Sequence, residues 1–276
     1  MRLAQIISML RTEPLFCAAG YRETLLDIID SHALLSAQDY KHSRTGKAKS
    51  GSDLEIAQME VVNGMAIIPV GGPIGMNLGE FEKGAGAVDV DDICAELDQA
   101  EEDDEVQAIL MNFDTPGGMV MGTPECGARI LAVEKPIYAW TRGQMCSAGY
   151  WLASCTNGIF CTPSASVGSI GVCMSFMDLS KLADNAGIKV KSFGSGTYKG
   201  MGTPGTSLTA EQEIFLKNRV QMLAQQFYDH VRAQRGPIPA EVMQGQSFTG
   251  AQALELGLVD GTMNTFEELA TFLTAK

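Results

Sequence analysis

The sequence predicts an α/β fold with a largely parallel sheet for most of its length. From about residue 59 onward, short apolar runs alternate with segments of helical periodicity. Strands separated by helices of ten or more residues are typical of crossover units on a parallel sheet. A hydrophobic fraction of 45% with 19% charged residues supplies enough apolar side chains for one sizeable core.

The main domain is expected to open with strands at residues 64–72 and 106–113, which flank a helix at 88–103. Both strands are short apolar runs, and the first is closed by glycines. The further elements expected are a helix at about 120–132, a strand within 135–140, a helix from Ser147, and strands at 158–161, 167–175 and 188–193.

The C-terminal part is expected to be mainly helical. Thr209 and Gln212 have the spacing of a capping box, and the helix that follows is stopped by Gly236 before a proline. Thr249 repeats this device before a helix that ends at Gly257. The long helix carries one apolar face, formed by Leu216, Val220, Leu223, Phe227 and Val231.

The first 55 residues read as an appendage to this domain. Residues 1–40 have helical spacing of apolar side chains, and residues 41–53 are polar and basic, with glycine and serine. We therefore expect a helical extension and linker over residues 1–55 and the main domain over 56–276. A charged loop inside one compact domain is the alternative interpretation.

Charge and composition exclude several functional classes. The net charge of −13 argues against nucleic acid as a partner, which requires a basic surface. No apolar run is long enough for a membrane span, and the N-terminus reads as an amphipathic helix rather than a signal peptide. The seven cysteines include no C-x-x-C pair, which indicates reduced thiols in the cytoplasm and no metal site.

A glycine turn, Asp114-Thr-Pro-Gly117-Gly118, directly follows an expected strand. Its two glycines permit backbone geometry in which N–H groups face a ligand oxygen, as an oxyanion hole requires. A plain turn from strand to helix is the other interpretation of this segment.

Ser147 lies at an expected helix start, where free N–H groups favour developing negative charge. It is a candidate nucleophile, with the N–H of Ala148 as a candidate oxyanion donor. An ordinary N-cap serine is the competing interpretation. Cys146 is the rival nucleophile, although a buried and inert thiol is the commoner role.

A catalytic serine needs a base, and the three histidines (His32, His42 and His230) all lie outside glycine-rich turns. Lysine is the remaining common base, and Lys199 lies in a glycine-flanked segment beside Tyr198. To act as a base it must be buried, because its pKa has to fall by roughly 3 units. A solvated loop lysine is the alternative. Ser169 lies between the two candidates and is suited to hold the amine, or is simply a serine at a strand end.

Five segments in unbroken order resemble the serine peptidases that include signal peptide peptidase A and the prohead (capsid-maturation) proteases of tailed phages. The resemblance extends over residues 62–261. Two residues depart from the family pattern: Ala148 stands where signal peptide peptidases usually have glycine, and Gly200 follows the lysine. The five segments are DTPGG at 114–118, SAGYW at 147–151, GSIGV at 168–172, YKG at 198–200 and FTGAQALELGLVD at 248–260.

The resemblance implies a ClpP/crotonase-like fold of stacked βα units and a Ser–Lys dyad that works without metal or cofactor. Ser147 aligns with the nucleophile, Lys199 with the general base and Ser169 with the hydroxyl that orients the lysine. Gly117 or Gly118, together with Ala148, matches the oxyanion donors. Tyr198 is a supporting residue, and Met119, Val120 and Met121 are expected to line the substrate groove. Family members form homo-oligomeric rings.

The resemblance thus implies a serine endopeptidase acting on polypeptides. A phage head-maturation protease that cleaves scaffold or capsid proteins, in the host cytoplasm or the prohead, fits better than a membrane-bound peptidase of signal peptides. A crotonase-like acyl-CoA enzyme and a non-catalytic capsid-assembly protein are the alternatives from other classes.

Overall fold

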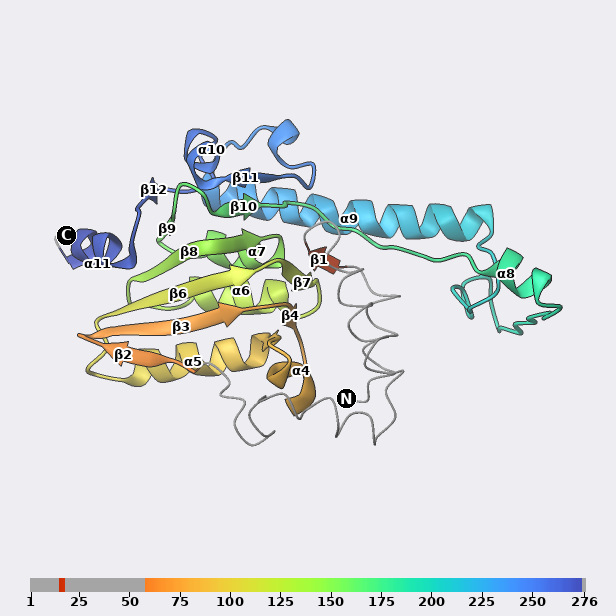
Figure 1. Ribbon diagram of the computed structural model, residues 1–276, viewed down its shortest axis with the longest axis horizontal. Helices are drawn as coiled ribbons and strands as arrows, with labels where there is room; N and C mark the ends of the chain where they lie inside the picture. Colours follow the sequence, from red (N-terminus) through yellow and green to blue (C-terminus); the bar gives the residue numbers. More distant parts are fainter. Residues whose placement is uncertain (1–14, 18–57, 275–276) are drawn as a thin grey trace, which may run out of the picture.

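The computed structural model describes residues 15–17 and 58–274, and its centre is a mainly parallel sheet (Figure 1). Strands β3 (Met65–Gly71), β6 (Ala108–Thr115) and β8 (Ile137–Cys146) run parallel and side by side. The end of β8 pairs with β10 (Ser166–Gly168), and its beginning pairs with β9 (Gly158–Cys161), both in parallel. The predicted α/β class is therefore confirmed.

Shorter strands complete this sheet at its borders. Strand β2 (Glu60–Val62) pairs antiparallel with β3, and β11 (Ser247–Thr249) pairs antiparallel with β10. Strand β12 (Gly261–Thr262) runs parallel to β9. The sheet order β11-β10-β8-β6-β3-β2 places β8 near the middle. The residue that follows β8, Ser147, is therefore positioned by a strand in the interior of the sheet.

One face of the sheet is covered by α5 (Val90–Glu102), α6 (Thr123–Leu131) and α7 (Ala148–Ser154) (Figure 1). Helix α5 begins where the buried Asp89 side chain accepts from the Asp91 N–H at 3.0 Å. Every residue of α7 is buried, because this helix lies between the sheet and the C-terminal helix α9. The chain thus alternates strands of a mainly parallel sheet with helices packed on it, as the sequence predicts.

A second, small sheet stands beside the carboxyl ends of the main strands, in the order β1-β7-β4-β5. Its members are β1 (Leu15–Cys17), β7 (Gly117–Met119), β4 (Ile74–Gly75) and β5 (Val88–Asp89). The short helix α4 (Glu80–Gly84) lies between β4 and β5 in the chain. Strand β7 contains both glycines of the predicted oxyanion turn.

The C-terminal part is helical, as predicted. Helix α9 (Ala210–Arg235) starts with the predicted capping box and ends at Gly236, whose φ is 83°. Helix α10 (Gly250–Glu255) starts with the second box, at Thr249. The 3-10 helix η1 (Ala240–Val242) joins α9 to this region, and α11 (Phe266–Thr274) packs on the far face of the sheet through Leu269.

Residues 173–209 form an arm that projects from the main body and carries the helix α8 (Ser180–Asn185) (Figure 1). The strand predicted at 188–193 is wrong, and the strand predicted at 167–175 stops at Gly168. Both segments lie on the arm or lead into it, where the described residues offer no neighbouring strand. Phe193, for example, is 91% exposed.

The apolar face predicted for α9 is only partly buried in one chain. Phe227 and Val231 are fully buried, whereas Leu216, Val220 and Leu223 are half-buried. The first half of α9 extends with the arm beyond the body, so it has no core to pack against (Figure 1). Of the predicted helical extension and linker at residues 1–55, the structure describes only residues 15–17. These form strand β1, so the helix predicted there is wrong, because these residues pair with β7.

Candidate active site

Ser147 sits at the sharp junction between β8 and α7. Its φ of 53° is rare for a residue with a side chain, and such strain is usually kept where function requires it. Its N–H donates to the Gly168 carbonyl at 2.8 Å, and its own carbonyl accepts the first hydrogen bond of α7, from Trp151 at 2.9 Å. The backbone of this serine is therefore fixed on both sides.

The Ser147 hydroxyl is buried but makes no hydrogen bond to any described residue. An ordinary N-cap serine would accept from an N–H of the first helical turn, and Ser147 makes no such side-chain bond. A buried hydroxyl without a partner costs free energy, which is consistent with a role outside folding.

Ser169 follows the neighbouring strand in the same way that Ser147 follows β8. Gly168 is paired with Cys146, so both chains turn at the next residue, and Ser169 has a φ of 51°. It is buried, and its N–H donates to the Gln246 carbonyl at 2.8 Å. The structure therefore brings Ser147 and Ser169 to adjacent positions at one edge of the sheet.

The predicted oxyanion donors lie around the same junction. Ala148 is the first residue of α7, and Gly117 and Gly118 form β7. The Gly117 N–H already donates to the Thr115 hydroxyl at 3.1 Å, and this hydroxyl donates to the Gly72 carbonyl at 2.6 Å. Gly118 is therefore the better donor candidate of the two glycines. The sequence analysis did not predict this role of Thr115 in holding the turn, although the residue lies within the DTPGG motif.

The glycine at position 118 is required by its surroundings. A Cβ atom there would lie 1.9 Å from the Ile74 carbonyl oxygen, whereas a Cβ at Gly71 would meet nothing within 4 Å. We expect Gly118→Ala to lower the free energy of unfolding by about 1–3 kcal/mol, since the backbone of β4 must move. Gly71→Ala is the matched control and should change it by less than about 0.5 kcal/mol. Urea unfolding measures both, and equal effects would contradict this packing.

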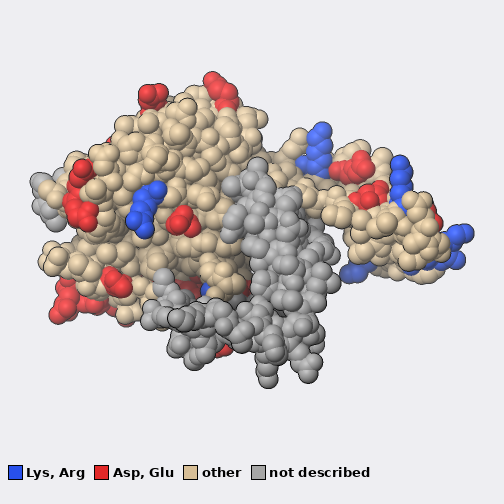
Figure 2. Space-filling model, viewed as in Figure 1, with Lys and Arg blue, Asp and Glu red and all other residues tan. Residues whose placement is uncertain are grey.

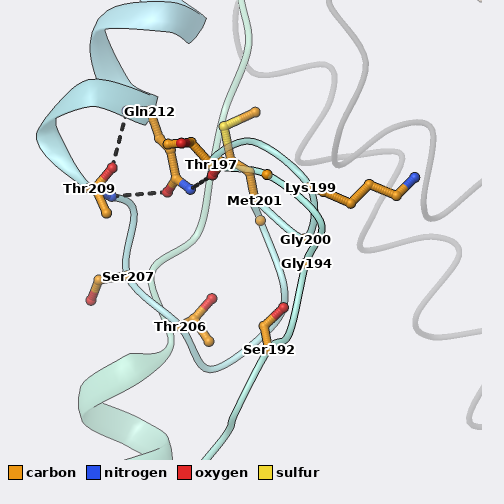
Figure 3. Close-up of a pocket in the computed structure, with 12 residues that line it drawn as sticks. Ser192, Gly194, Thr197, Lys199, Gly200, Met201, Thr206, Ser207, Thr209 and Gln212 are labelled. Carbon is orange, nitrogen blue, oxygen red and sulfur yellow. Dashed lines mark hydrogen bonds between the residues drawn. The ribbon is translucent and has the colours of Figure 1, made fainter.

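Lys199 is placed far from Ser147 in the single chain. It is exposed and lies on the arm, where it lines a cavity of about 320 Å³ together with Thr209 and Gln212. In Figure 3 its side chain points away from this cavity. The cavity therefore belongs to the arm and does not contain the candidate nucleophile.

The long helix α9 gives the scale of this separation. Its first turn lines the cavity beside Lys199, whereas its residue Phe227 packs on Trp151 of α7 with ring centroids 5.1 Å apart. At about 1.5 Å per residue, the helix between Ala210 and Phe227 covers roughly 25 Å. No lysine side chain spans that distance. The structure does not bring Ser147 and Lys199 together within one chain.

The segment around Lys199 is nevertheless well defined. Tyr198 donates to Glu211 at 3.0 Å, and its ring packs at a tilt of 31° against Phe215 with centroids 4.6 Å apart. These contacts join the arm to α9. Gly200 has a φ of 89°, and a Cβ there would lie 2.5 Å from the Ser192 hydroxyl. The departure from the family pattern at Gly200 thus follows from the turn. Tyr198 supports the loop and does not reach Ser147.

The rival nucleophile and base have structural roles instead. Cys146 is buried, its Sγ lies within 3.7 Å of the Ser166 and Ser247 hydroxyls, and burial raises its pKa. It is thus the inert thiol that the sequence favours. His230 stacks on Trp151 with centroids 4.2 Å apart, and its Nε2 lies 3.0 Å from the Ser154 hydroxyl. It joins α9 to α7.

His230 gives the stability a specific pH dependence. Burial lowers its pKa, so the unfolded chain binds a proton more readily than the folded one as the pH falls through about 6.5. The free energy of unfolding should therefore fall between pH 7 and 5, and His230→Gln should make this fall shallower. Urea unfolding at several pH values tests this, and an unchanged slope in the variant would contradict it.

Residues 15–17 and 58–274 contain neither a candidate membrane span nor a candidate metal site. In these residues, no helix combines the length and apolarity that crossing a bilayer requires. Nor do their histidine, cysteine and carboxylate side chains gather into a group of three or more that could hold a metal ion.

Comparison with known proteins gives a family match. Residues 129–275 match the model of Peptidase family S49. The chain is 29% identical over 289 residues to capsid assembly protease C of Escherichia phage lambda, an alignment that covers 99% of this chain and 66% of that protein. An Enterococcus faecium protein named for signal peptide peptidase SppA is 28% identical over 171 residues, covering 60% of this chain and 50% of that protein. The chain thus spans half to two thirds of the length of these relatives.

Among solved structures, an enoyl-CoA hydratase/isomerase family member matches with a TM-score of 0.46 and 15% identity. The match covers 79% of this chain and 74% of that structure.

Proposed function

Because the chain belongs to Peptidase family S49, we propose that it is a serine endopeptidase in which Ser147 is the nucleophile and Lys199 of a neighbouring copy is the general base. One observation carries this proposal. A buried hydroxyl without a partner stands on a strained turn beside backbone N–H groups, while the candidate lysine is held on an arm directed away from its own body.

The proposed chemistry is acyl transfer. Neutral Lys199 removes the hydroxyl proton of Ser147, and the oxygen attacks the carbonyl carbon of a peptide bond. The N–H groups of Ala148 and Gly118 stabilise the negative charge on the carbonyl oxygen. The resulting ammonium of Lys199 gives its proton to the leaving amine. Water then hydrolyses the ester, with Lys199 again as base, and Ser169 orients the amine.

The arm has the properties of an interface between copies. It exposes large apolar side chains to water in the single chain. Helix α9 continues this surface along its first half. The exposed apolar residues are Phe176, Met177, Leu182, Ile188, Phe193, Tyr198, Ile214, Phe215 and Met222. Docking of this surface on a second copy would bury them and form a homo-oligomer, with a ring as the closed form.

Charge complementarity also favours a second copy as the partner of the arm. Residues 173–209 contain four lysines and two aspartates, whereas the whole chain has a net charge of −13. Figure 2 shows most of the Lys and Arg side chains of this view on the projecting part, where some Asp and Glu also lie, and further Asp and Glu over the body. A basic arm is attracted to the acidic body of another copy.

Docking would also supply what the lysine needs. Lys199 is exposed in the isolated chain, whereas a lysine that acts as a general base is buried away from carboxylates. Docking on a second copy would give the amine that buried environment. Activity is therefore expected to depend on assembly, and dilution of the protein below its assembly concentration should abolish it.

The substrate is proposed to bind as an extended strand along β7. The edge of β7 that faces β1 can form backbone hydrogen bonds with an extended peptide when β1 does not occupy it. Met119 at its end is almost buried, whereas Val120 is half-buried and Met121 is 51% exposed. These apolar side chains are proposed to line the groove that follows Gly118.

The proposed biological role is head maturation in a phage or prophage, with scaffold or capsid proteins as substrates in the host cytoplasm or prohead. The lambda relative named as a capsid assembly protease aligns with 99% of this chain, which favours this role. Degradation of signal peptides is the second candidate, because the relative named for SppA aligns with 60%.

Co-expression with a candidate scaffold protein tests the role. The wild-type chain should produce scaffold fragments that are visible by mass spectrometry and absent with Ser147→Ala. If the scaffold stays intact while a synthetic signal peptide is degraded, the second candidate replaces the first.

A further inference from the structure

Strand β1 lies against β7 on the edge that a substrate peptide would use (Figure 1). Leu15–Cys17 pairs antiparallel with Gly117–Met119, while β4 pairs with the other edge of β7. Within residues 58–274, no strand pairs with the β1 side of β7. The chain therefore fills this edge with its own N-terminal segment.

The register of this pairing places β1 across the proposed catalytic turn. Phe16 is opposite Gly118, the glycine whose N–H is the candidate oxyanion donor, and Cys17 is opposite Gly117. An added strand binds mainly through its backbone, so this pairing needs no particular side chains. A peptide that pairs with Gly118 and a β1 that pairs with Gly118 exclude each other.

We propose that β1 is an intramolecular competitor that keeps β7 closed to other peptides until it is displaced. The inference rests on the proposed function in taking β7 as the substrate edge. A tethered strand acts at an effective concentration in the millimolar range, which exceeds that of most free peptides. A free peptide therefore binds the intact chain more weakly than it would bind an open β7.

A binding experiment in the full-length Ser147→Ala background tests the competition without catalysis. The probe is a fluorescent synthetic peptide with the sequence of residues 13–20, EPLFCAAG. In the test variant, Leu15→Pro and Phe16→Pro are combined. Adjacent residues of a strand direct their N–H groups to opposite sides, so one of the two prolines removes a hydrogen bond to β7.

The matched control carries Glu60→Pro and Val61→Pro in β2, which is also an edge strand but pairs with β3 instead of β7. We expect the peptide to bind the β1 variant at least about tenfold more tightly than the Ser147→Ala chain. The β2 variant should bind it with the affinity of the Ser147→Ala chain. Fluorescence anisotropy gives the three dissociation constants.

Equal affinity for all three proteins would overturn the inference, and so would absence of binding to all three, because β7 would then accept no added strand. Neither result depends on peptidase activity. Failure of the proposed function would be recognised separately, as absent labelling of the wild-type protein by a fluorophosphonate probe.

Discussion

Replacing Ser147 by alanine is expected to lower the rate of peptide hydrolysis by at least about a thousandfold and to abolish labelling by a fluorophosphonate probe. The hydroxyl oxygen is the atom that attacks, and nothing else at the β8–α7 junction replaces it. Because Ser147 makes no side-chain hydrogen bond among the described residues, its loss should leave the fold intact. Rates on a fluorogenic peptide and gel-based labelling measure both effects.

Cys146→Ala is the matched control for this prediction. Cys146 is the adjacent residue and is equally buried, but its thiol lies near the Ser166 and Ser247 hydroxyls. This variant should keep most of the activity and all of the labelling. Loss of labelling in Cys146→Ala together with its retention in Ser147→Ala would assign the nucleophile to the cysteine.

Lys199→Ala is expected to be as inactive as Ser147→Ala when each variant is pure, but a mixture of the two should regain activity. In the mixture, the Lys199→Ala chain supplies Ser147 and the Ser147→Ala chain supplies Lys199. If the interface joins successive copies head to tail, random assembly gives about a quarter of the wild-type sites. Co-refolding at equal concentrations, followed by the peptide assay, measures this recovery.

The control for the lysine is Lys189→Ala, which removes another exposed lysine of the same arm. It should retain activity, because only Lys199 is proposed to remove the serine proton, whereas four lysines contribute to the positive charge of the arm. A mixture of Ser147→Ala and Lys199→Ala that stays inactive, although the two chains assemble, would show that the base does not come from a neighbouring copy.

The sequence was sufficient for the elements of the main domain because their signals are local. Short apolar runs, the first of them bounded by glycines, predicted β3 and β6. The capping boxes at Thr209 and Thr249 predicted the starts of α9 and α10. The strand predicted at 188–193 failed because its apolar residues are exposed on the arm, where an apolar run need not become a strand. A strand requires a partner, and that is a property of the tertiary structure.

The sequence was sufficient to identify the candidate residues of the site, but it did not predict how they are arranged in space. The turn motifs identified Ser147 and the glycines. The structure places Ser147 and Ser169 at the ends of two paired strands, and the glycines in β7 of the small sheet, which contacts α7. The role of Thr115 was missed because it depends on a contact with Gly72, 43 residues away. The distance from Ser147 to Lys199 follows from the projection of α9, and apolar periodicity alone does not distinguish a core face from an interface face.

The most direct test of the dyad is an experimental structure of the assembled full-length protein. The account predicts that the Ser147 hydroxyl oxygen of one copy lies about 2.6–3.2 Å from the Lys199 Nζ of another, with that amine out of contact with water. An assembly in which every Lys199 amine is solvated and remote from every Ser147 would contradict it.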